Sequence, residues 1–445
     1  MKLWQKENTS TAETIEKFTV GKDREMDLYL AAADVLGSLA HTQMLESIGL
    51  LTKEELTQIH AALKHIYQNI QKGQFVIEDG IEDVHSQIEW LLTQTLGETG
   101  KKIHSGRSRN DQVLTDIKLF LRDQVTTIAN ETKRLFDLLN TLSDQYKDIL
   151  LPGYTHLQIA MPSSFGLWFG AYAESLVDDM LVLQSTYKIT NKNPLGSGAG
   201  YGSSFPLNRT LTTQLLGFET LNYNVVYAQM TRGKTEYSVA TSIAAIASTL
   251  SRLAMDVCLY NSQNFSFITL PDDLTTGSSI MPHKKNPDVA ELLRGKTNRL
   301  KALPQELALL MSNLPSGYHR EMQLTKEILF PALDEILNCL QITHFMLEHV
   351  RVKEDILQDS RYHYLFSVER VNELVLQGVA FRDAYKQVGK EIADGTYTPN
   401  LNIQHTHEGS IGNLCNAQIA NEMQKVMDGF NFEKAENAVI DLLNA

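Results

Sequence analysis

Hydrophobic positions along this chain recur mainly at the period of α-helices. Between residues 111 and 151, apolar side chains spaced i, i+4, i+7 and i+8 form the stripe of a bundle helix. Residues 235–263 are apolar around most of the helix circumference and contain neither Gly nor Pro, which predicts a helix buried among other helices. Residues 288–312 are a third expected helix. Alternating runs bounded by turn residues are nearly absent, so any sheet should be small.

Proline spacing supports the same architecture, because residues 1–151, 207–270 and 332–398 contain none. We therefore expect an all-α fold, with a long central helical bundle and smaller N- and C-terminal helical domains. The predicted boundaries are 1–105, 106–352 and 353–445. Most unusual residue clusters fall in the loops between the expected helices, where functional residues often lie.

Composition narrows the function without identifying it. The formal net charge is -13 and the pI about 5.5, which disfavours nucleic acid and acidic membrane surfaces as partners. Cys258, Cys339 and Cys415 are far apart, which predicts neither a disulfide framework nor a zinc site. The polar N-terminus and the absence of 18 uninterrupted apolar residues predict a cytoplasmic chain with no membrane span.

The loop TTGSSIMPHKKNPD, residues 275–288, is rich in hydroxyl and N–H donors. Composition alone also fits a solvated Ser/Lys loop. However, GSSIMPHKKNP resembles the signature G-S-S-x-M-P-x-K-x-N of the fumarase/aspartase superfamily, a specific pattern. The resemblance implies elimination of fumarate, or a close relative of it, from a succinyl-type substrate without metal or coenzyme. It also implies that Ser278 is the general base and that Lys284 and Asn286 stabilise the developing negative charge.

A second segment, IHSGRSRNDQVLTD at residues 103–116, offers two guanidinium groups suited to carboxylates. Read alone, it is also an Arg-rich helix start paired with Asp111 and Asp116. It resembles the argininosuccinate lyases, the branch of the superfamily that catalyses the last step of arginine biosynthesis. The resemblance implies that Ser108, Arg109 and Asn110 bind substrate.

The third region, PGYTHLQIAMP at residues 152–162, should form a tight turn before a helix. A lone histidine is usually structural. In the family, a matching Thr-His pair lies at the active site, which implies that His156 is the general acid, supported by Thr155 and oriented by Glu291.

Further matching segments cover most of the chain. They are LGSGAG at 195–200, EDVHSQIEWLL at 82–92, GVAFRDAY at 378–385 and YHREMQLTKE at 318–327. The last implies that Tyr318, Gln323 and Lys326 contact a small-molecule substrate. The family also implies a homotetramer in which three subunits contribute to each active site.

Some positions depart from the family pattern. His283 stands where argininosuccinate lyases usually carry Gln and adenylosuccinate lyases carry His, so adenylosuccinate cleavage is the alternative activity. Leu324 and Thr325 replace an acidic pair, and residues 367–374 also differ. A second alternative, of another class, is a catalytically silent structural protein like some lens δ-crystallins.

Two local patterns are expected to be unrelated to catalysis. His405 and His407 form an H-x-H pair without further spaced ligands, so we expect no metal. The glycines of residues 196–202 lack the G-x-G-x-x-G spacing and a preceding strand, which favours close backbone approach over nucleotide binding.

Overall fold

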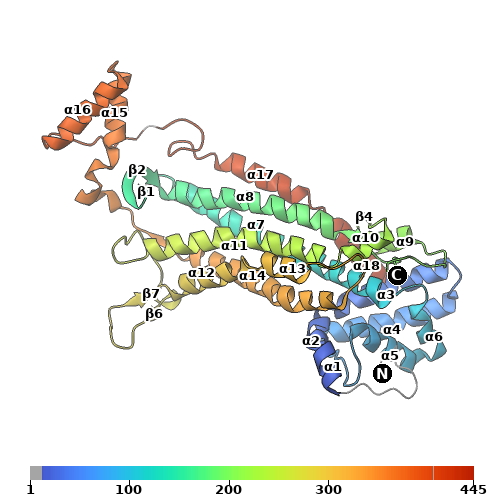
Figure 1. Ribbon diagram of the computed structural model, residues 1–445. Helices are drawn as coiled ribbons and strands as arrows, with labels where there is room; N and C mark the ends of the chain where they lie inside the picture. The colour runs from blue at the N-terminus through green and yellow to red at the C-terminus, as the bar shows by residue number, and fades with distance from the viewer. Residues whose placement is uncertain (1–12, 404) are drawn as a thin grey trace.

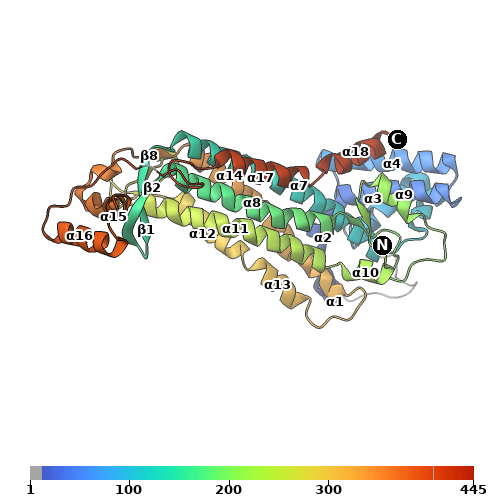
Figure 2. The ribbon, with the colours of Figure 1, turned by 90° about the horizontal axis from the view of Figure 1, so that it is seen from above.

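The computed structural model describes residues 13–403 and 405–445, and its centre is a bundle of helices that run alongside one another (Figures 1 and 2). Residues 1–12, which open the polar N-terminal segment, lie outside the described residues. The bundle helices are α7 (Arg109–Gln145), α8 (Phe165–Thr190), α11 (Lys234–Tyr260), α12 (Asp288–Leu300), α13 (Leu303–Leu310) and α14 (Leu324–Glu348). The expected all-α fold with a long helical bundle is confirmed.

The apolar stripe of residues 111–151 does bury one face of α7. Val113, Ile117 and Leu121 all lie in the main hydrophobic core, and α7 packs along α8 and α14. The helix begins at a capping box, in which the Asp111 carboxylate accepts from the Ser108 backbone N–H. It ends at Gln145, earlier than expected, because Leu150 and Leu151 belong to a strand.

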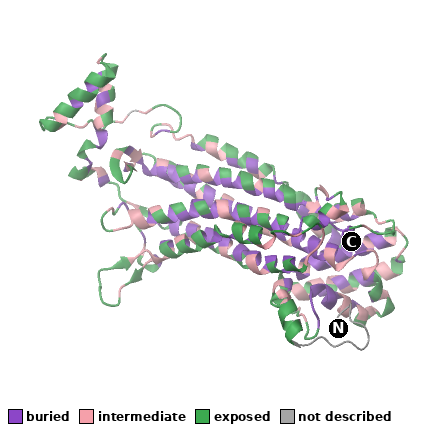
Figure 3. Cartoon of the chain, in the orientation of Figure 1, coloured by how far each residue is buried: buried purple, intermediate pink, exposed green. Residues whose placement is uncertain are grey.

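Helix α11 matches the apolar segment expected at 235–263 and packs against α8, α12, α13 and α14. Among the described residues, it is the one helix whose length and composition would allow it to cross a membrane. However, 56% of its most apolar window is buried inside the chain. Its apolar surface is therefore used largely by the neighbouring helices of the bundle (Figure 3).

The single helix expected at 288–312 is wrong, because the structure has two helices there. Helix α12 ends at Leu300 and α13 starts at Leu303, with Pro304 in its first turn. Proline lacks an N–H and its ring clashes with the preceding turn, so it is tolerated at a helix start and breaks a helix interior. Pro331 nevertheless lies inside α14.

The N-terminal helices and two short helices from the middle of the chain gather at one end of the bundle (Figure 1). They are α1 (Glu13–Val20), α2 (Asp23–Asp27), α3 (Ala31–Ser47), α4 (Lys53–Gln71), α5 (Val84–Leu96), α6 (Glu98–Lys101), α9 (Arg209–Leu215) and α10 (Val225–Met230). Thr52 caps α4 by accepting from the Glu55 N–H, and Glu55 accepts from the Thr52 N–H in return.

The C-terminal part has two different environments. Helices α15 (Ser367–Leu376) and α16 (Phe381–Ala393) project from the opposite end of the bundle and share a small core of their own. Helices α17 (Asn416–Asp428) and α18 (Phe432–Asn444) return along the bundle and pack on α8 and α3, respectively. The three-domain division proposed from the sequence stays a prediction.

The described strands form two-stranded sheets only. Strand β1 (Leu150–Thr155) pairs antiparallel with β2 (Gln158–Ser164), and the short pairs are β3 (Lys192–Asn193) with β4 (Thr220–Leu221), β5 (Ile268–Thr269) with β8 (Arg351–Val352), and β6 (Thr276–Gly277) with β7 (Lys285–Asn286). The β1–β2 and β6–β7 hairpins both lie at the end of the bundle away from α2 and α5 (Figure 1).

Candidate active site

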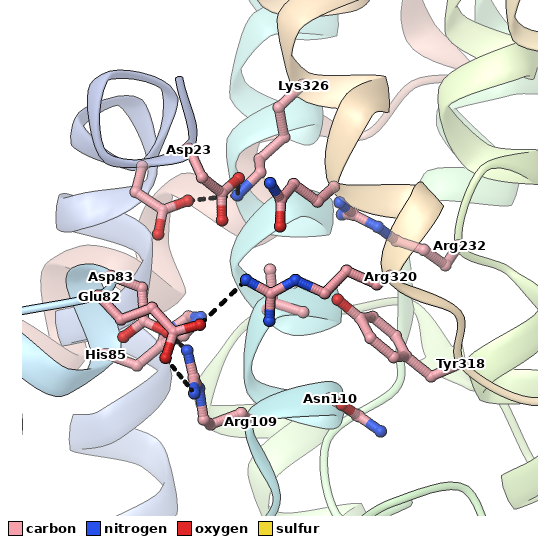
Figure 4. A pocket seen from close by; sticks show the side chains of 13 residues that line it. Asp23, Glu82, Asp83, His85, Arg109, Asn110, Arg232, Tyr318, Arg320 and Lys326 are labelled. Carbon is pink, nitrogen blue, oxygen red and sulfur yellow. Dashed lines mark hydrogen bonds and ion pairs between the residues drawn. The ribbon is translucent and has the colours of Figure 1, made fainter. Parts of the chain in front are cut away.

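A pocket of about 150 Å³ lies where α2 and the starts of α5, α7 and α14 meet (Figure 4). It brings together five residues predicted from two separate motifs: Arg109, Asn110, Tyr318, Gln323 and Lys326. Arg109 and Asn110 occupy the first turn of α7, and the other three lie at or just before the first turn of α14. The sequence motifs therefore meet in space at this end of the bundle.

Carboxylates from α2 and from the loop before α5 pair with three cations of this pocket. Lys326 pairs with Asp23 and Asp27 at 2.5 Å each, and its side chain is only 3% exposed. Although burial opposes its charge, Asp27 and Asp23 raise the pKa of Lys326, so it stays protonated.

Three arginines line the pocket, and two of them, Arg109 and Arg320, share a partner, while Arg232 pairs with Glu236 of α11 at 3.3 Å. Arg109 lies 3.4 Å from a carboxylate oxygen of Glu82 and also pairs with Asp83, while Arg320 contacts the other Glu82 oxygen at 3.0 Å. The pocket thus presents alternating charges, which suits a ligand that carries both carboxylates and cationic nitrogens.

Ser108 lies at the N-cap of α7 and fixes the turn that carries Arg109 and Asn110. The turn is tied to the glycine-rich loop, because the Asp111 carboxylate accepts from Gly196 N and Gly198 N, both at 2.9 Å. Burial raises the pKa of Asp111 to about 6 despite these bonds. A Cβ at Gly198 would lie 2.9 Å from the Gly202 carbonyl oxygen, which agrees with the close backbone approach expected for this loop.

Ser278, Lys284 and Asn286 lie elsewhere, in the exposed β6–β7 hairpin. The loop folds back on Ser278, whose Oγ accepts from Ile280 N at 3.3 Å and from Met281 N at 3.1 Å. Asn286 Nδ2 lies 3.5 Å from Thr276 Oγ1 at the base of the hairpin. The hydroxyl thus already receives two backbone donors.

Thr155 and His156 lie at the exposed tip of the β1–β2 hairpin, which confirms the tight turn expected there. His156 and Leu157 both adopt left-handed backbone conformations, with φ of 53° and 58°. Glu291 is exposed in the first turn of α12. Within the described part of a single chain, no hydrogen bond or ion pair joins His156 to Glu291.

The pocket and the two hairpins are therefore separated by the length of the bundle. Helix α7 begins at the pocket with Arg109, and the hairpin of His156 follows its other end. Its 37 residues span roughly 55 Å at the α-helical rise. One copy of the chain does not bring all the predicted site residues together.

Several residues that line the pocket were not assigned a role from the sequence. Glu82, Asp83 and His85 lie in a segment that was recognised as family-like, and Arg320 lies beside Tyr318. Asp23, Asp27 and Arg232 belong to none of the motifs. Their signal is weak, because single charged residues at helix starts are common on protein surfaces.

Comparison with known proteins agrees with these features. A family model described as lyase matches residues 6–301. Argininosuccinate lyase of Bacteroides thetaiotaomicron is 62% identical over 442 residues, which cover 99% of each chain. Among solved structures, an EDDS lyase variant with bound fumarate has a TM-score of 0.76 at 20% identity, covering 98% of this chain and 95% of the other. Class II fumarase from Schistosoma mansoni has a TM-score of 0.70 at 15% identity, covering 86% and 91%.

The two structural relatives share the fold. The family follows from the identity to a curated relative along essentially the whole sequence, together with the match of the lyase model to more than half of it. This chain is a member of the argininosuccinate lyase family.

Proposed function

We infer that this protein is a carbon–nitrogen lyase that splits argininosuccinate into arginine and fumarate by β-elimination. The observation that carries this inference is the 62% identity to an argininosuccinate lyase over nearly the whole chain. The pocket is compatible with this substrate, because argininosuccinate carries three carboxylates and two cationic groups, which complement its paired cations and anions. We further propose a cytoplasmic location, as the reduced cysteines would suit.

The elimination requires a base, an acid and a site for the developing charge. We propose Ser278 as the base that takes the proton from the carbon beside a carboxylate. Lys284, Asn286 and backbone N–H groups of the flap, residues 277–287, would stabilise the carbanion, at about 3 kcal/mol for a well-placed donor. His156, with Thr155 and Glu291, would protonate the departing guanidino nitrogen.

The proposed site is shared between subunits of a homotetramer. Ser278 and His156 lie at one end of a bundle roughly 55 Å long, and the substrate pocket lies at the other. Antiparallel association of such bundles would place the hairpins of one copy beside the pocket of another. Arg109, Asn110, Tyr318, Gln323 and Lys326 would then bind the substrate on which a partner's Ser278 acts.

If the sites are shared between subunits, we expect two inactive variants to recover activity when they form mixed oligomers. Asn110→Ala damages the pocket and Ser278→Ala damages the flap, so each alone should be nearly inactive. Co-expressed in equal amounts, they should regain about a quarter of normal turnover, because about one site in four combines an intact pocket with an intact flap. Fumarate release by the purified mixed oligomer measures the recovery.

The matched control is a mixture of Asn110→Ala with Tyr318→Phe, which both affect the pocket. The rate of fumarate release by this mixture should stay near the sum of the rates of the two variants measured separately. If mixed oligomers of the first pair form and show no recovery, or if the chain sediments as a monomer at working concentration, the shared site is wrong.

The substrate itself is tested by incubating the purified chain with argininosuccinate and, separately, with adenylosuccinate, while fumarate is measured. Only argininosuccinate should be cleaved efficiently. His283 in the flap is the feature that favours adenylosuccinate. Faster fumarate release from adenylosuccinate than from argininosuccinate would therefore contradict the inferred activity and indicate an adenylosuccinate lyase. No turnover of either substrate would favour a δ-crystallin-like structural role.

A further inference from the structure

Behind the pocket lies a buried cluster of three ionisable side chains from three helices. Asp34 of α3, His85 of α5 and Asp116 of α7 are 0%, 5% and 1% exposed. His85 Nδ1 contacts an oxygen of Asp34 and lies 3.3 Å from an oxygen of Asp116. Gln112 Nε2 also donates to Asp34, at 2.8 Å. The cluster joins the N-terminal helices to the start of the bundle.

The three groups do not carry equal charges. Burial, reinforced by the neighbouring Asp34, raises the pKa of Asp116 well above its ordinary value. Burial opposes ionisation of Asp34 and His85 too, but each stabilises the charge of the other, so the pKa of Asp34 is lowered and that of His85 is raised. These shifts favour the charged forms of Asp34 and His85 and the neutral form of Asp116. Arg107 and Asp27 are the other charged groups that act on this cluster.

His85 also lines the substrate pocket (Figure 4). Its Nδ1 contacts the carboxyl groups of Asp34 and Asp116, while its Nε2 has no hydrogen-bond partner among the described residues. A histidine held at one ring nitrogen by a carboxylate presents the other N–H in a fixed direction.

The position of its counter-ion distinguishes His85 from three of the other cations of the pocket; the fourth, Arg232, also pairs with a carboxylate outside the pocket, that of Glu236. Arg109, Arg320 and Lys326 pair with carboxylates that themselves line the pocket, whereas Asp34 and Asp116 lie behind it. A ligand carboxylate can therefore approach His85 without displacing a carboxylate of the pocket, which makes the interaction less costly in desolvation and rearrangement.

We propose that His85 is a further substrate-binding residue, whose Nε2–H donates to a carboxylate of argininosuccinate, and that Asp34 and Asp116 are its positioning residues. This rests on the proposed function. The interaction is present before and during reaction, so it contributes to substrate affinity more than to turnover.

Two substitutions of His85 distinguish the proposed contact of Nε2 with substrate from the buried contact of Nδ1 with Asp34. The amide of Asn reaches the position of Nδ1 and the amide of Gln reaches that of Nε2. His85→Asn should raise KM for argininosuccinate about 10- to 100-fold with kcat changed little, because it loses a charged hydrogen bond to the substrate. His85→Gln, which restores a pocket donor, should recover part of this loss. Equal KM for both variants and the unaltered enzyme would overturn the proposal.

A second pair of substitutions, at Asp34 and Asp116, tests whether the two carboxyl groups carry different charges. Asn resembles the neutral acid at 116 but removes the anion at 34, so Asp34→Asn should lower kcat/KM at least about tenfold more than Asp116→Asn. An equal or reversed order would overturn the positioning roles. Circular dichroism and melting temperature show whether each variant folds, and if Asp34→Asn does not, the His85 pair decides.

The unaltered enzyme is measured in every series, so its failure to release fumarate would contradict the proposed function and not the role of His85. The same three side chains have the spacing of metal ligands. If EDTA abolished activity and a divalent cation restored it, a metal site would replace the proposed hydrogen bond.

Discussion

Ser278→Ala is expected to lower kcat for argininosuccinate by a factor of about 10²–10⁴, the range for loss of a general base. The substitution removes one half-buried oxygen from a loop outside the hydrophobic core, so the fold should be preserved. Substrate affinity should also change little, since the proposed pocket lies on another subunit. Steady-state fumarate release gives kcat, and equilibrium binding of argininosuccinate to the inactive variant gives the affinity.

The expected size of this effect depends on how a serine can act as a base. A serine hydroxyl is a weak base in water, and its alkoxide needs strong stabilisation. The flap supplies part of it, because Ile280 N and Met281 N already donate to Ser278 Oγ. Lys284 in the same hairpin can add a positive charge, and closure of the flap over substrate would exclude water and strengthen both effects.

Ser279→Ala is the matched control, since it removes the adjacent hydroxyl from the same loop. It should retain most of the turnover. Near-normal fumarate release by Ser278→Ala, or equal losses in the two variants, would exclude Ser278 as the base.

The sequence was sufficient to predict the helical bundle because its helices are long and their apolar periodicity is strong. Helix α11 is the clearest case, since its expected and observed bounds differ by at most three residues. Two helix bounds were predicted wrongly because of local features. Pro304 divides the helix expected at 288–312, and strand pairing at Leu150 shortens the helix expected at 111–151. Boundaries depend on single residues and on tertiary pairing, which periodicity does not report.

The sequence predicted only those site residues that lie within contiguous motifs. The motif around Arg109 and the one around Tyr318 contained the five pocket residues that were predicted to bind substrate. Asp23 and Arg232 reach the same pocket as isolated charges, and the buried partners of His85 come from two other helices. Nor could spacing alone show that Ser278 and the pocket lie at opposite ends of the bundle, because that depends on helix lengths and packing.

His156→Asn is expected to lower kcat by a factor of about 10²–10⁴ and to change the shape of its pH profile, because the proposed acid is lost. Asparagine is the substitution of choice because residue 156 has a φ of 53°, and Asn tolerates the left-handed region better than most residues. The turn that presents Thr155 should therefore survive. Fumarate release measured across a range of pH gives the profile.

His349→Asn, an exposed histidine on the C-terminal side of α14, is the matched control and should leave the profile unchanged. An unaltered rate and pH profile in His156→Asn would exclude this residue as the acid. A lowered rate with an unaltered profile would indicate that His156 orients the substrate without transferring a proton. Because the hairpin lies far from the pocket of its own chain, His156→Asn should also be complemented by Asn110→Ala, as a residue contributed to a neighbouring subunit's site must be.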